Sequence, residues 1–168
     1  MKKVLLSKTT WCVLIGVALI VGMAIPGKLS ITITKSLDKR VFWMSDDTSL
    51  IKKGDYVLFG LDTGRLSKDI TIPETVIKGT LVRAIKRVAC FEGEILRVDG
   101  LDYYCNEVSI GRAKTLTIKG KPLAQFVFNG PIPKESVFVI GDHPDSYDSR
   151  YYGLIDRSTF ISRAIALF

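Results

Sequence analysis

An uncharged run near the N-terminus constrains the fold of this 168-residue chain more than any other feature. Residues 9–27, TTWCVLIGVALIVGMAIPG, carry no charge and are long enough to cross the apolar core of a bilayer as a helix. Three lysines precede the run, and flanking positive charge favours the cytoplasmic side of a membrane. The sequence therefore predicts a cytoplasmic N-terminus at 1–8, a single transmembrane anchor at 9–27 and an exported, periplasmic domain at 28–168.

The same run has a second interpretation as a cleavable signal peptide. Gly22, Met23 and Ala24 place small residues where such a peptide would be cut. The apolar run is long for a signal peptide, so the retained anchor is favoured.

Composition limits the partners that this chain is expected to bind. The formal net charge is +7, but the 24 basic residues are scattered and show no pattern typical of a nucleic-acid surface. The positive charge and the anchor favour contact with membrane lipid. One histidine, the lack of a CxxC pair and the lack of a glycine-rich phosphate loop predict neither a metal nor a cofactor.

Short β-type runs separated by turns fill the rest of the chain. Leu29–Ser36 and Leu81–Cys90 alternate in the manner of strands, and residues 113–133 are expected to add further strand. Glycine, aspartate and asparagine interrupt the runs at turn positions. The predicted fold class is mainly β, a domain of coiled antiparallel sheets.

Lys86 is the unusual residue of the run Leu81–Cys90. Strand alternation places it among Val82, Ala84 and Val88 on an otherwise apolar face. A lysine in such a position reaches back to water, pairs with an acid, or is kept neutral for chemistry. Desolvation would lower its pKa and allow the amine to accept a proton from a serine hydroxyl.

Ser36 is a candidate for that serine because it ends the first exported run, nine residues beyond the anchor. The Ser36 backbone N–H and the Thr34 hydroxyl could bind an oxyanion together. His143, the only histidine, would be needed for a Ser-His-Asp arrangement, but it stands in a turn-like segment where an exposed position is expected.

Two further groups of residues lie near these candidates in the sequence. Cys90 and Cys105 would form a disulfide in an oxidising compartment, or remain two free thiols. The polar segment 139–153, VIGDHPDSYDSRYYG, carries acids and an arginine whose ion pairs could shape a rigid turn.

These segments, in this order, resemble the type I signal peptidase family. KSLDKRVFW resembles its nucleophile box, AIKRVACFEGE its lysine box, and GDHPDSYDSRYYG its C-terminal box. The single anchor, Ser-Leu, RVAC and YYCN look more like the TraF-type conjugative-transfer peptidases, which mature pilin subunits and in some members join the pilin ends into a ring. The resemblance implies a signal-peptidase-type fold and a polypeptide substrate, such as a pilin or another exported precursor.

The resemblance also implies roles for individual residues. Ser36 would be the nucleophile, Lys86 the general base and Asp148 the supporting acid. The adjoining turn would be shaped by four further residues: Gly141, Asp142, Ser149 and Arg150.

The nucleophile box departs from the family pattern, because Asp38 and Arg40 stand where a proline and a glycine are usual. His143-Pro144 likewise replaces the more usual Asn-Arg. Neither departure removes a reacting group, but the first leaves the geometry of the loop after Ser36 open.

Two other functions remain open from the sequence. A membrane-tethered β-domain could act as a non-catalytic scaffold of a secretion or conjugation complex, with Lys86 in a structural ion pair. A self-cleaving repressor-type Ser/Lys protease shares the chemistry, but it requires a DNA-binding module where this chain has an apolar run.

Overall fold

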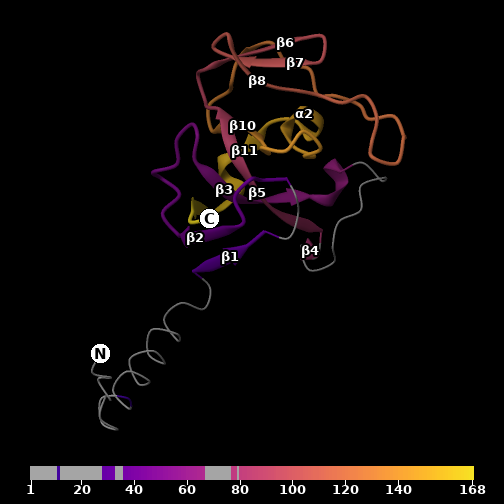
Figure 1. Ribbon diagram of the computed structural model, residues 1–168. Helices are drawn as coiled ribbons and strands as arrows, with labels where there is room; N and C mark the ends of the chain where they lie inside the picture. The colour runs from indigo at the N-terminus through magenta and orange to yellow at the C-terminus, as the bar shows by residue number, and fades with distance from the viewer. Residues whose placement is uncertain (1–10, 12–27, 33–35, 67–76, 79) are drawn as a thin grey trace, which may run out of the picture.

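Two antiparallel β-sheets make up the fold (Figure 1). A computed structural model describes residues 11, 28–32, 36–66, 77–78 and 80–168. Apart from Trp11, the predicted anchor lies outside the described residues, and within them no helix has the length and apolar character needed to span a membrane.

The larger sheet has eight strands in the order β1-β2-β12-β3-β5-β10-β11, and β4 also pairs with β5. Its strands are β1 (Leu29–Ile31), β2 (Val41–Ser45), β3 (Tyr56–Asp62), β4 (Ile77–Lys78), β5 (Leu81–Cys90), β10 (Ser136–Ile140), β11 (Ile155–Asp156) and β12 (Phe160–Ala166). Within the described residues, three short helical turns accompany them: η1 (Thr63–Arg65), α2 (Ser149–Tyr152) and η3 (Arg157–Thr159). The predicted mainly β, antiparallel architecture is confirmed.

The smaller sheet has four strands in the order β8-β7-β6-β9 and lies above the larger sheet in Figure 1. Its strands are β6 (Ile95–Asp99), β7 (Asp102–Cys105), β8 (Val108–Arg112) and β9 (Gly130–Pro131). Its buried face packs with the end of β5 and with β10 in one apolar cluster that includes Leu96, Tyr103 and Phe138.

Strand β5 is central to the larger sheet and shows why alternation placed Lys86 correctly. It pairs with β3 from Leu81 to Arg87, and Val57 is the partner of Lys86. Val82, Lys86 and Val88 are all buried; on the other face Leu81 and Arg83 are exposed, while Ile85 and Ala89 are buried in neighbouring apolar clusters. The buried face of β5 therefore contains a lysine surrounded by core residues.

Two expectations about strands were wrong. Strand β1 ends at Ile31, and Ser36 lies in a turn rather than at the end of a strand. Of the further strand expected over residues 113–133, only the short β9 at Gly130–Pro131 forms, while residues 113–129 contain a single bridge, Leu116 with Pro122. The Thr-Leu-Thr-Ile alternation in this segment has no sheet to pack on, and Ile118 is 88% exposed.

Candidate active site

Lys86 is the centre of the candidate site. Its side chain is buried, with 6% relative exposure, and Nζ donates a 2.9 Å hydrogen bond to Ser146 Oγ. Burial disfavours the ammonium form and, with a smaller contribution from the charge of Arg150, lowers the pKa from 10.5 to about 8. Asp148 and Asp142 act in the opposite direction, but desolvation is the largest cause.

This pKa changes how much of the amine can act as a base. At pH 7 a pKa of about 8 leaves about a tenth of Lys86 neutral, whereas the ordinary value of 10.5 would leave about 0.03%. The strand therefore provides a lysine that accepts a proton near neutral pH, as the sequence predicts for a desolvated amine.

Gly141 brings the backbone of Ser36 next to Ser146. Strand β10 ends at Ile140, which is paired with Arg87, so Gly141 begins the turn beside Lys86. A Cβ at Gly141 would lie 2.1 Å from Ser146 Oγ and 2.5 Å from the Ser36 carbonyl oxygen. Only glycine fits here, because both groups occupy the space of a side chain.

The turn that contains Ser36 is attached to the C-terminal box by backbone contacts. The His143 N–H donates to the Ser36 carbonyl at 3.2 Å, and the Asp38 N–H donates to Asp142 Oδ2 at 3.4 Å. The Ser36 carbonyl and Ser146, the hydrogen-bond partner of Lys86, therefore both lie against Gly141. Thr34, the second predicted oxyanion donor, lies outside the described residues.

Asp148 forms a buried ion pair that supports this turn. Its carboxylate is fully buried and receives two hydrogen bonds from the Arg150 guanidinium, at 2.8 and 2.7 Å. It also accepts from the Gly141 N–H at 2.9 Å, while Ser149 Oγ accepts from the Val139 N–H. Of the predicted turn residues, Gly141 and Arg150 therefore contact Asp148, which also acts on Lys86 through its charge.

Other acids of segment 139–153 pair outside this core. Asp142 binds Arg87 at 2.9 Å, and Asp145 binds Lys114. The His143 side chain is 42% exposed, and its Nδ1 accepts a hydrogen bond from the Asp145 N–H. This exposed turn position is the one expected from the sequence, and it does not favour His143 as a catalytic base.

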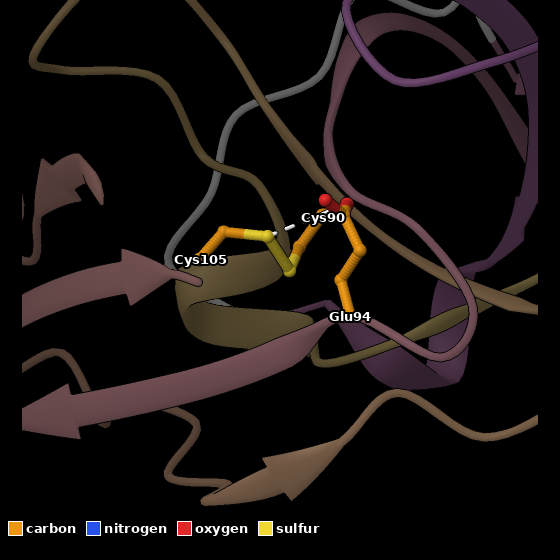
Figure 2. A group of neighbouring side chains, drawn as sticks. All are labelled: Cys90, Glu94 and Cys105. Carbon is orange, nitrogen blue, oxygen red and sulfur yellow. Dashed lines mark hydrogen bonds between the residues drawn. A yellow bond between two sulfur atoms is a disulfide. The ribbon is translucent and has the colours of Figure 1, made fainter. Parts of the chain in front are cut away.

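A disulfide joins Cys90 to Cys105 and links the two sheets (Figure 2). Cys90 ends β5, four residues after Lys86, and Cys105 ends β7 in the smaller sheet, so the two strands are not hydrogen-bonded neighbours. Glu94 Oε2 lies 3.4 Å from Cys105 Sγ (Figure 2). Cys90, Glu94 and Cys105 lie close enough together to suggest a metal site, but both sulfurs are in the disulfide and offer no thiolate. The two cysteines therefore form a covalent link between the sheets.

Ser146 is the site residue that sequence reasoning missed. It is 2% exposed and its hydroxyl is the hydrogen-bond acceptor for the Lys86 amine. In the sequence it is one polar residue in a loop without period, and only the packing of Gly141 against it reveals its place. Its position three residues before helix α2, which begins at Ser149, gave no separate signal.

Comparison with known protein families gives a match over nearly the whole chain. Residues 3–168 match the family model described as signal peptidase, peptidase S26. The chain belongs to this family. Its members are serine endopeptidases, and the family relation indicates processing of exported polypeptide precursors.

No curated protein matches. Among solved structures, signal peptidase I from Enterococcus faecalis V583 is 21% identical, covers 70% of this chain and 97% of its own, and superposes with a TM-score of 0.41.

Proposed function

We propose that this peptidase S26 member is a membrane-anchored endopeptidase that uses Ser36 as nucleophile and Lys86 as general base. The observation that carries the proposal is the buried amine of Lys86, with a pKa of about 8, held by Ser146 beside the backbone of Ser36. The anchor at 9–27 would place residues 28–168 in the periplasm at the surface of the bacterial inner membrane.

The proposed reaction begins when Ser36 Oγ attacks the scissile carbonyl carbon and Lys86 takes the hydroxyl proton. The Ser36 N–H and the Thr34 hydroxyl bind the oxyanion. Lys86 then protonates the leaving amine, and an acyl-enzyme remains on Ser36. Water completes hydrolysis, whereas attack by the substrate's own amino terminus would form a new amide and a cyclic product.

The pairing of β5 favours a polypeptide substrate, because one of its edges is partly unpaired among the described strands. Strand β3 pairs with one edge of β5. The other edge pairs with β4 at Leu81 and Val82 and with β10 from Arg87 onward. Among the described strands none pairs with residues 83–86 on this edge. An extended substrate could add its backbone there, directly beside Lys86.

The substrate class that we propose is an exported precursor cut after small residues, in particular a conjugative pilin, with or without ring closure. This part rests on the resemblance of Ser-Leu, RVAC and YYCN to TraF-type peptidases.

Co-expression of candidate pilin precursors with the wild type and with Ser36→Ala tests the proposal. We expect the wild type to release a trimmed product and Ser36→Ala to release none, because the variant has no hydroxyl to acylate. Intact-mass measurement separates the outcomes, since a cyclic product is lighter than the trimmed linear peptide by one water. Equal processing by both proteins would refute Ser36 as nucleophile.

The same strains separate the enzyme from a tethered scaffold. Full pilus assembly by Ser36→Ala would favour a non-catalytic role, because the substitution leaves the two sheets intact. Loss of assembly with an accumulated precursor supports the peptidase.

A further inference from the structure

The Asp142 carboxylate joins three segments that lie far apart in the sequence. Its Oδ2 accepts a 2.8 Å hydrogen bond from the Tyr56 hydroxyl on β3, and Oδ1 accepts a 2.9 Å bond from Arg87 Nε on β5. Oδ2 also accepts from the Asp38 N–H at 3.4 Å. Asp142 therefore connects the loop after Ser36 to the two central strands.

Tyr56 is placed for this contact by the sheet register. It is the direct partner of Arg87, one position along from the pair formed by Val57 and Lys86. Its ring packs edge-on against Phe42 with centroids 5.3 Å apart, which fixes the direction of the hydroxyl. Burial and the bond to Asp142 raise the pKa of Tyr56 to about 12, so the hydroxyl remains a donor near neutral pH.

The Asp38 N–H is a donor that depends on the residue type at this position. A proline, the residue usual at this place in the nucleophile box that the sequence resembles, has no N–H. In this chain the loop instead offers a backbone hydrogen to the carboxylate that Tyr56 orients. The 3.4 Å distance makes this bond the weakest of the three, so it depends on how precisely the carboxylate is held.

We propose that Tyr56 is a positioning residue that orients Asp142 toward the Asp38 N–H and thereby fixes the Ser36 turn relative to Lys86. The proposal rests on the proposed function for its kinetic consequence, but not for its structural one. Without the Tyr56 hydroxyl, the Asp142 carboxylate keeps its hydrogen bond to Arg87 but is free to turn its second oxygen away from the Asp38 N–H. The turn that carries Ser36 then loses one of its attachments to the lysine strand.

Tyr56→Phe in the full-length protein tests this role, because it removes one oxygen and keeps the ring against Phe42. The substrate is a quenched fluorescent peptide with alanines before the scissile bond, selected because the wild type cleaves it. We expect kcat to fall about tenfold and KM to change less than twofold, as for a lost hydrogen bond to a charged group that positions the nucleophile.

A second readout does not need activity. Hydrogen exchange of a peptide fragment that contains Asp38 should be faster in Tyr56→Phe than in the wild type. Tyr104→Phe is the matched control, since Tyr104 lies in the smaller sheet beneath Arg97, and both readouts should remain unchanged. Asp142→Asn should lower kcat, and adding Tyr56→Phe to it should lower kcat no further.

The two readouts distinguish failure of this proposal from failure of the proposed function. Wild-type kcat and wild-type exchange at Asp38 in Tyr56→Phe would overturn the positioning role, even if the variant melted at a lower temperature. If Ser36→Ala cleaved the peptide as well as the wild type, the proposed function would fail, and exchange at Asp38 would still decide whether Tyr56 holds the turn. Unchanged exchange in that case would overturn the proposal.

Discussion

Lys86→Met is expected to reduce peptide cleavage by about 10²–10⁴-fold, the contribution of a positioned general base. Methionine keeps an unbranched apolar chain of similar length but has no amine, so it fills the same space between the core residues of β3 and β5. Since the desolvation cost of the amine disappears as well, the variant should be at least as stable as the wild type. The measurement is kcat/KM on the same peptide, alongside urea unfolding.

Lys53→Met provides the control for loss of a lysine. Lys53 is partly exposed and pairs with Glu94 at the junction of the sheets, away from Ser146. Its replacement should leave cleavage unchanged. A Lys86→Met protein with half of the wild-type activity would exclude Lys86 as the base, while normal unfolding of an inactive variant would show that the loss is chemical.

Asp148→Ala is expected to lower the free energy of unfolding by about 3–5 kcal/mol, as for removal of one partner of a buried ion pair. The Arg150 side chain is only 5% exposed and would lose both of its bonds to the carboxylate. The Gly141 N–H, which is buried, would lose its acceptor too. We expect the midpoint of urea unfolding to fall and cleavage to decrease at temperatures where the variant is still folded.

Asp145→Ala is the matched control for Asp148→Ala. Asp145 lies in the same segment, 139–153, but its ion pair with Lys114 is exposed. Exposed ion pairs contribute little to stability. The unfolding midpoint should therefore change little. If Asp148→Ala unfolded at the wild-type urea concentration, the buried pair would not be the support of the Gly141 turn.

The position of Lys86 could be predicted from the sequence because strand alternation has a fixed period. Residues two apart share a face, so the run Leu81–Cys90 determined which side chains accompany the lysine before any partner strand was known. The run itself forms one strand with the expected bounds, Leu81–Cys90.

Contacts between segments could not be predicted in this way. Ser146 reaches Lys86 only because β10 pairs with β5 in a register that ends at Ile140, and loop residues have no period from which that register follows. The Tyr56–Asp142 bond depends on the same pairing. The fate of Cys90 and Cys105 also stayed open, since a covalent link between sheets requires their relative placement.

Deprotonation of Ser36 requires that Lys86 be neutral in a sizeable fraction of molecules, and direct titration of Lys86 tests this point. The measurement follows the ¹³Cε resonance of Lys86 against pH in Ser36→Ala, with assignment by its disappearance in Lys86→Met. We expect the Lys86 titration to have its midpoint near pH 8, because the amine is buried against Ser146. A midpoint at or above 10.5, the ordinary value, would contradict it.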